Sequence, residues 1–327
     1  MIWLTWRLHR TESVIGLALI ALLALALVPT GLDVAHTYRS MGLAACVDGA
    51  ASDDAIISCN QLTNAFFEEF NTVRGLVDWL NFLPVIVAML LAAPFLNELE
   101  HGSFRMSWTQ SITRTRWAAY RIGAILGTAG LLGAAWRTAM TWWLRPFSEQ
   151  QGIFPPNDFN FQGIVPIAYF LFAAALILAA GSISRRTVAT LVVALVVFLP
   201  IRLGIEGKLR PRYQAPLTAI EETNGPPSLA EGAVERRDWV VSQGLLDAEG
   251  NRLSGDEFGA LCPPDVRREG VQVMPVDCVE AHGLRRYEEY QPAGRFWRFQ
   301  LIESAIYLSL SAGLVALAFW WVTRRLA

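Results

Sequence analysis

Four ionisable side chains lie within or beside long apolar runs of the sequence, namely Asp78, Arg137, Arg202 and Glu303. An ionisable group at membrane depth is costly, and it usually faces a protein interior or a water-filled cavity. The alternative is that the side chain extends to place its charge at the membrane surface, and this fits Asp78 and Arg202 about as well as an interior position. Arg137 lies about two helical turns inside its run. We therefore expect Arg137 to line a polar cavity.

Motifs for other chemistry are missing from the sequence. It has no GxxxxGK[ST], and GIEGK at 204–208 has the wrong spacing, so the chain is not expected to hydrolyse a nucleotide by itself. It has no HExxH and no GxSxG. The histidines are scattered at positions 9, 36, 101 and 282, which predicts no metal site. We expect a protein that is not an enzyme, with no catalytic residue and no cofactor of its own.

The composition is that of a membrane protein. Of 327 residues, 53% are hydrophobic and 17% are charged, whereas a soluble domain carries about 25% charged residues. The net charge of −2 gives no sign of nucleic-acid binding. The apolar residues form six blocks of about 18–24 residues, the length of a membrane-spanning helix. These blocks cover 13–32, 76–96, 121–143, 163–181, 188–205 and 301–322. We expect each of them to be helical, because backbone groups in lipid must be satisfied within the segment.

The first of these blocks, 13–32, follows two arginines and could be taken for a signal peptide. Its run is too long for one, and Thr30-Gly31-Leu32-Asp33 is a poor cleavage site. We expect it to be retained as span one. The spans with their short connections are assigned to 13–205 and 301–327.

Two segments outside the spans have recognisable patterns. At 1–12, Trp3, Trp6, Arg7 and Arg10 recur at helical spacing, which predicts an amphipathic helix on the membrane surface. The alternative is an ordinary positive flank. Residues 206–300 are polar, with alternating runs such as DWVVS and VQVMPVD that favour some β structure. The predicted fold is thus an all-α polytopic membrane protein with six spans, an N-terminal amphipathic helix and a small external domain.

Arginine placement predicts the orientation in the membrane. Arginines precede span one, lie within the joint 97–118, form the joint Arg185-Arg186 and occur near the C-terminal end. The connector 33–75 is instead rich in acidic residues. The positive-inside rule therefore places both termini in the cytoplasm. We therefore expect a multi-pass protein of a cell membrane. The connector 144–162 is expected to form a loop, with a turn at Pro155-Pro156-Asn157-Asp158.

The four cysteines agree with this orientation. Cys46 and Cys59 lie in the connector 33–75, and Cys262 and Cys278 in the polar segment 206–300, both of which the arginines place outside. Disulfides persist in such an oxidising compartment. Four cysteines allow three pairings, and we favour Cys46–Cys59 and Cys262–Cys278, which close short loops. A zinc site is the alternative, but the sequence has no CxxC and no nearby histidine pair.

The joint NELEHGSFRMSWTQSITRTRWA at 97–118 is too ordered for a simple linker. Gly102-Ser103 permits a sharp turn, and FRMSWTQSI predicts a short amphipathic helix, because Phe104, Trp108 and Ile112 recur at i, i+4 and i+8. Two acidic residues before the turn, Glu98 and Glu100, the turn itself and a small exposed helix together suggest a docking site for a cytoplasmic partner. The alternative is a solvated linker whose arginines only set the topology.

The stretch LPVIVAMLLAAPFLNELEHGSFRMSWTQSITRTRW resembles the permease subunits of bacterial ABC-2 type ABC exporters, especially an actinobacterial-style group. MIWLTWRLHR, LRPRYQAP and YQPAGRFWRFQLIES resemble further parts of these subunits. Asn97 and Arg212 depart from the pattern, where the family has arginine and histidine.

The resemblance implies the transmembrane subunit of an ATP-driven exporter. Its N-terminal helix would be the elbow helix, and 98–113 would be a coupling region seated in a separate ABC ATPase. Two permease chains, a homodimer or a heterodimer, would join two ATPases that bind ATP and Mg, in a bacterial plasma membrane. The residues implied in coupling are Glu98, Glu100, His101, Gly102, Ser103, Phe104, Trp108 and Gln110.

Two other functions remain open at this stage. One is a membrane sensor or structural protein whose disulfide-bonded external module binds a ligand. The other is a membrane-embedded enzyme acting on lipid, for which the sequence offers no reactive group of residues at one depth. Copurification of an ATPase would favour the exporter, and of a kinase the sensor. The nature of the cargo stays open.

Overall fold

The computed structural model describes the chain in five stretches, residues 2–47, 53–104, 113–221, 237–262 and 276–325. The chain divides into two compact units. The first, the helical unit, contains Met1–Gln150, Pro156–Arg210 and Trp297–Ala327. The second, the sheet unit, contains Gln151–Pro155 and Pro211–Phe296.

Six helices are long and apolar enough to cross a membrane within the described residues, which confirms the predicted number of spans. The stretches are Ala21–Ser40, Asn71–His101, Arg114–Gln151, Val165–Ser184, Thr187–Arg212 and Ala293–Arg324. The α-helices of the first, third, fourth and sixth stretches are α1 (Ile2–Ser40), α7 (Arg114–Gln151), α9 (Val165–Ser184) and α13 (Phe296–Arg324). The second stretch contains α4 (Asn71–Asp78), η1 (Trp79–Phe82) and α5 (Leu83–His101), and the fifth contains α10 (Thr187–Gly204), η2 (Ile205–Leu209) and η3 (Arg210–Arg212).

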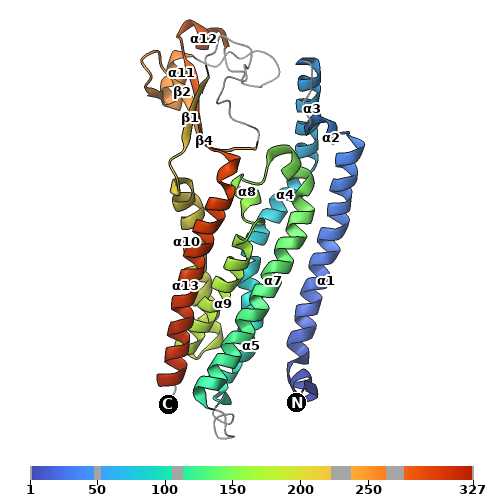
Figure 1. Ribbon diagram of the computed structural model, residues 1–327, viewed down its shortest axis with the longest axis vertical. Coiled ribbons are helices and arrows are strands. Elements are labelled where there is room, and N and C mark those ends of the chain that lie inside the picture. The colour runs from blue at the N-terminus through green and yellow to red at the C-terminus, as the bar shows by residue number, and fades with distance from the viewer. Residues whose placement is uncertain (1, 48–52, 105–112, 222–236, 263–275, 326–327) are drawn as a thin grey trace. The chain divides into compact units, whose positions relative to one another are not determined.

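The helical unit has two ends, which we name by the chain termini. In Figure 1 the start of α1 and the end of α13 lie at the same end, as an even number of alternating spans requires. We call this the terminal end and the opposite one the distal end. The end of α5 and the start of α7 lie at the terminal end, and the end of α7 and the start of α9 lie at the distal end.

Helical structure extends further than the sequence predicted. α1 continues without a break from residue 2, so the N-terminal segment is helical, and its position on a membrane surface stays a prediction. The connector 33–75 is largely helical, with α2 (Ala44–Val47) and α3 (Asp53–Glu69). The predicted loop 144–162 is wrong over its first half, because α7 continues to Gln151, and the short α8 (Pro156–Phe159) follows.

Small residues let the central helices approach closely. α5, α9 and α10 pack against one another, and α9 is the most buried of the six spans. A Cβ on Gly181 of α9 would stand 2.2 Å from the side chain of Leu96 on α5. A Cβ on Gly133 of α7 would stand 3.0 Å from the backbone of Ile167. Such contacts are how helices gain van der Waals packing in lipid, where no hydrophobic force drives them together.

A buried glutamine from another span satisfies the first amides of α9. Oε1 of Gln300 on α13 accepts hydrogen bonds from the backbone N–H of Ile164 and of Val165, each at 2.9 Å. Its Nε2 donates to the carbonyl of Phe159 at 3.2 Å. Gly163 leaves room for this side chain, because a Cβ there would stand 2.4 Å from it, and its φ of +67° suits glycine. The start of α9 is thus fixed by α13.

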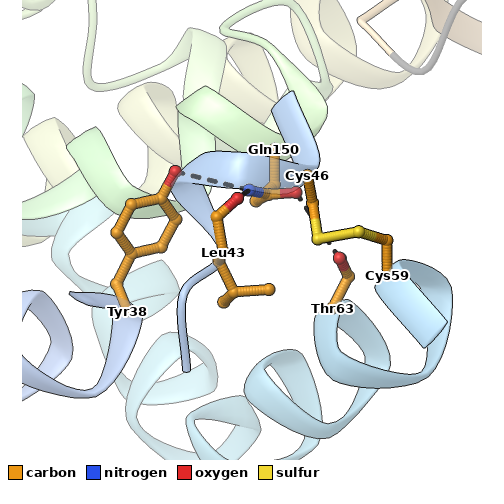
Figure 2. The surroundings of a disulfide bond; sticks show 6 residues. All are labelled: Tyr38, Leu43, Cys46, Cys59, Thr63 and Gln150. Carbon is orange, nitrogen blue, oxygen red and sulfur yellow. Dashed lines mark hydrogen bonds between the residues drawn. A yellow bond between two sulfur atoms is a disulfide. The ribbon is translucent and has the colours of Figure 1, made fainter. Parts of the chain in front are cut away.

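Both predicted disulfides are present. Cys46–Cys59 joins α2 to α3, and Cys262–Cys278 lies in the sheet unit. Figure 2 shows the first bond beside the end of α7.

Gln150 of α7 binds the end of α1, the turn before α2 and helix α3. Its Nε2 donates to the carbonyl of Leu43 at 3.0 Å and to the hydroxyl of Tyr38 at 3.3 Å. Its Oε1 accepts a hydrogen bond from Thr63 of α3 at 3.4 Å (Figure 2). The connector between spans one and two is therefore held against span three by a buried amide.

The sheet unit contains a four-stranded antiparallel sheet with the order β1-β4-β2-β3. Its strands are β1 (Leu217–Glu221), β2 (Trp239–Leu246), β3 (Arg252–Leu253) and β4 (Arg285–Gln291), and its helices are α11 (Gly255–Leu261) and α12 (Val276–Ala281). The run DWVVS forms the start of β2, as predicted. VQVMPVD lies largely outside the described residues, and its last two residues open α12.

Asp158 on α8 is a buried carboxylate with one satisfied oxygen. Its Oδ1 accepts a hydrogen bond from Arg74 at 3.2 Å, while its Oδ2 has no hydrogen-bond partner among the described residues. The pKa of Asp158 is raised to about 6, because burial, with a smaller contribution from Asp78, outweighs the lowering effect of Arg74. The fold therefore favours the protonated form.

This gives a stability that depends on pH. Because the folded-state pKa of Asp158 is raised, its contribution is fully present below the unfolded-state pKa near 3.8 and is lost as the pH rises through about 6. We expect Asp158→Asn to melt at a higher temperature than the parent at pH 7.5, with the difference vanishing toward pH 4. Thermal unfolding in detergent across this range measures it. A difference that does not change with pH would contradict the prediction.

Candidate coupling site and buried ion-pair cluster

The turn that follows span two is set by a glycine. α5 ends at His101, and Gly102 takes a left-handed conformation with φ +70° as its C-cap. A Cβ at Gly102 would meet nothing within 4 Å, so the backbone conformation alone favours glycine here. The sequence-based expectation of a sharp turn at Gly102-Ser103 is therefore matched by the described geometry.

The two acids before this turn bind other spans of the same chain. Glu98 forms an ion pair with Arg121 of α7. Glu100 accepts hydrogen bonds from the backbone N–H of Thr187, at 2.9 Å, and from its hydroxyl. Thr187 is the first residue of α10, whose N-cap residue Arg186 makes no capping hydrogen bond with its side chain. Glu100 thus caps span five from span two, where a carboxylate also suits the helix dipole.

Aromatic packing fixes Phe104, which directly follows the turn. Phe104 is only 4% exposed, and its ring lies 6.2 Å from that of Trp117 at the start of α7. Trp117 stacks in turn on Phe95 of α5, with 6.0 Å between ring centroids. Phe104 therefore faces the helical unit. Of the coupling residues named from the sequence, Trp108 and Gln110 lie outside the described residues, together with the predicted helix around them.

The exposed side chains of this site form one short strip. Asn97, Glu100, His101 and Ser103 are all exposed at the end of α5. Nδ1 of His101 lies 3.0 Å from the carbonyl of Asn97, so the imidazole is held along the helix. A protein that binds the terminal end can touch these residues, whereas Glu98 is partly buried in its ion pair.

A second polar group lies inside the helical unit, among the distal parts of spans four, five and six. We call it the Arg210 cluster. It contains Asn160, Tyr169, Arg202, Glu206, Arg210 and Glu303.

Arg210 and Glu303 form the centre of this cluster. Nε of Arg210 donates to Oε2 of Glu303 at 2.7 Å, and its Nη2 donates to Oε1 of Glu303 at 2.8 Å. The same Nη2 lies 2.7 Å from Oδ1 of Asn160. Tyr169 donates its hydroxyl proton to Glu303. Both charged side chains are fully buried, and the two parallel bonds have the geometry in which an Arg–carboxylate pair is strongest.

Arg202 completes the cluster from an earlier part of span five. It is 1% exposed, and its Nη1 lies 3.7 Å from Glu303 and 3.6 Å from Glu206. Its guanidinium carbon lies 3.7 Å from the centre of the Tyr169 ring, and its Nη2 donates to Asn81 at 3.3 Å. The snorkelling alternative for Arg202 is therefore wrong, because the side chain points into the protein. The two arginines balance the two glutamates in charge.

Arg137 has a different environment. It is half-buried on α7, and its Nε has no hydrogen-bond partner among the described residues. A small cavity of about 10 Å³ lies next to its neighbour Trp136 and reaches Asn81, Asn160 and Tyr169, but Arg137 is not among the residues that line it. Its expected role as a cavity-lining residue stays a prediction.

Arg202 and Glu303 of this cluster stand out in the sequence as charges within apolar runs, whereas Asn160, Tyr169, Glu206 and Arg210 do not. Arg210 lies in the polar flank LRPRYQAP, where a charge is ordinary. The available signal was that two arginines spaced by eight residues share a helical face with Glu206 between them.

Comparison with known proteins gives one match. Residues 17–210 match the family model described as "ABC-2 membrane transporter related", which is more than half of the 327 residues. No curated protein and no solved structure matches the chain.

The Arg210 cluster predicts a large asymmetry between single and paired substitutions. Glu303→Gln should destabilise the protein by about 3–5 kcal/mol, because it leaves two buried guanidinium groups without their shared carboxylate. The double variant Arg210→Met with Glu303→Leu should lie closer to the parent, since no charge of that pair remains buried. Unfolding in detergent measures both, with Leu301→Ala on an exposed face of α13 as control. Equal losses in the single and double variants would refute the pairing.

Proposed function

Since this chain belongs to the ABC-2 membrane transporter related family and is the transmembrane subunit of an ABC transporter, we propose that it works in an ATP-driven exporter, coupled to a separate ATPase. The six candidate spans supply a membrane path, and two copies of the chain would share it. In this proposal ATP and Mg bind only to the two ATPase subunits. The partner subunits supply the hydrolysis, and the residues of this chain supply docking and movement.

One observation carries the coupling part of the proposal. Glu98 and Glu100 tie the end of span two to span three, through Arg121, and to span five, through Thr187. A displacement of the turn that follows α5 would therefore move α5, α7 and α10 together. We propose that closure of the ATPases moves this turn, and that the two acids pass the movement to α7 and α10.

The docking surface would be the exposed strip at the end of α5. Asn97, His101 and Ser103 offer hydrogen-bonding groups to a partner, while Phe104 is buried and would hold the turn in shape. We propose Trp108 and Gln110, in the segment that follows, as further contacts. In this proposal the two acids before the turn act chiefly within this chain.

Arginine placement supports a cytoplasmic terminal end. Arg114 begins α7, Arg185 and Arg186 join α9 to α10, and Arg324 ends α13. All of these positions belong to the terminal end, whereas the Cys46–Cys59 disulfide lies at the distal end. The positive-inside rule then favours cytoplasmic termini, and the disulfides favour an oxidising outer side. We propose the plasma membrane of a bacterial cell as the location.

A charge exchange tests how Glu98 acts. Glu98→Arg should uncouple ATP hydrolysis from transport, because the new arginine repels Arg121 and the ion pair between α5 and α7 is lost. The double variant Glu98→Arg with Arg121→Glu should recover coupling, since the ion pair between α5 and α7 is restored. The measurements are ATPase copurification and cargo-stimulated hydrolysis. If the ATPase copurifies but the double variant stays uncoupled, then Glu98 acts directly on the partner. If no ATPase copurifies even with the parent chain, the proposed function fails.

A pair of glycines tests the turn. Gly102→Val should abolish ATPase copurification while the permease remains inserted, because a β-branched residue disfavours the left-handed conformation of the turn. Gly123→Val is the matched control, since a Cβ on Gly123 would also meet nothing within 4 Å, but this glycine lies inside α7 with an ordinary φ. Equal ATPase binding by both variants would show that the turn is a simple linker.

A further inference from the structure

The sheet unit brings three metal-ligating side chains to one place. Cys262, Cys278 and His282 each place one ligand atom within 4.8 Å of the others. The two sulfurs form the disulfide, and the histidine lies beside it. We propose that this group is a thiophilic metal site that opens when the disulfide is reduced, with Cys262, Cys278 and His282 as ligands for Zn²⁺ or a similar ion.

The histidine already lies at a ligand distance from its nearer sulfur. Nδ1 of His282 is 3.5 Å from Sγ of Cys278. Two ligands of a tetrahedral zinc ion, with Zn–S near 2.3 Å and Zn–N near 2.0–2.1 Å, stand about 3.6 Å apart. Nδ1 also lies 3.0 Å from the carbonyl of Cys278, to which it donates a hydrogen bond, so metal binding through Nδ1 requires the ring to give up this bond and its Nδ1 proton. Ligands at i and i+4 share one face of a helix.

The surrounding packing should keep the donors together after reduction. Cys262 is buried with Val279 and Leu284, and Leu245 and Phe258 pack against them. The backbone N–H of Cys262 donates to the carbonyl of Phe258 at 2.8 Å. These contacts do not need the disulfide. For tetrahedral zinc the two sulfurs must separate to about 3.8 Å, and donor atoms that now lie up to 4.8 Å apart must approach one another. Water can fill the fourth position.

A dithiol is the reductant that opens the disulfide. The Cys262–Cys278 bond breaks, the two cysteines become thiols, and the dithiol becomes a cyclic disulfide, with two electrons and two protons passing to the protein. Binding of a divalent ion then releases the two thiol protons as the thiolates form. Disulfide and metal therefore compete for the same two sulfurs, and thiolate with imidazole ligands suits Zn²⁺ better than Mg²⁺, Ca²⁺ or Mn²⁺.

The sequence does not reveal this site, because its three metal-ligating residues are not close together in the chain. Cys278 and His282 have the spacing of one helical turn, but Cys262 lies 16 residues earlier and reaches them only through the fold. The expectation of no metal site was based on the lack of CxxC and of a histidine pair, and the proposal departs from it.

Cobalt titration of the full chain in detergent tests the proposal. The protein is reduced with dithiothreitol, freed of it without oxygen, and titrated with Co²⁺, whose thiolate bands report on tetrahedral sulfur ligation. The reduced parent should bind one Co²⁺ per chain more than Cys262→Ser with Cys278→Ser. The oxidised parent should lack this site. Because both proteins keep Cys46 and Cys59, metal bound there does not affect the difference.

A histidine pair supplies the matched control. His282→Ala should weaken the extra site at least about tenfold, as expected when a group that holds a metal is lost. His36→Ala, which removes another exposed histidine, should leave the affinity unchanged. Circular dichroism checks that each reduced variant is folded. The proposal is overturned if the oxidised protein binds as much Co²⁺, if the double cysteine variant binds as many ions as the parent, or if the two histidine variants bind alike.

Discussion

Polar groups inside the helical unit must find their partners within the chain, and this constraint accounts for most of its connections. Hydrocarbon offers no hydrogen bonds, so a helix end or a charge that lies among the spans has to be satisfied by another span. Gln300 does this for the start of α9 and Glu303 for Arg210, while Glu100 caps the start of α10 at the exposed terminal end. In each case the partner lies on another helix than the group it satisfies, so each polar contact is also a tie between helices.

These ties divide the helical unit into two connected sets. At the terminal end, α5 is joined to α7 and to α10 by its two acids. Toward the distal end, α9, α10 and α13 are joined in the Arg210 cluster, where Arg202 of α10 lies against Tyr169 and Glu303. α10 belongs to both sets. In the proposed exporter, movement imposed at the α5–α7 turn would therefore reach the distal end through span five, without any contact between the turn and the cluster.

The sheet unit is held together differently. Its hydrophobic core is small, so a covalent bond between Cys262 and Cys278 supplements the packing of Val279 and Leu284. The same packing holds His282 next to the sulfurs. A structural disulfide and a metal site thus need the same arrangement of side chains, and the redox state of the two sulfurs decides which of them exists.

The sequence by itself determined the class of the protein, the number of spans and the cysteine pairs. Helices that cross a membrane are specified by the length and apolarity of a continuous segment, and both disulfides join cysteines close together in the chain. The ends of helices were predicted less well, since α7 runs on through Pro146 to Gln151, where packing outweighs the local turn signals.

The tertiary structure alone decided the role of each polar residue. Arg202 could have snorkelled, and only its position under Tyr169 shows that it is buried. Gln300 binds amides that lie 135 and 136 residues away, and Glu100 caps a helix 87 residues away. The sequence records which side chains can bond, but whether a charge or an amide is buried, and which group satisfies it, depends on which distant segments pack around it.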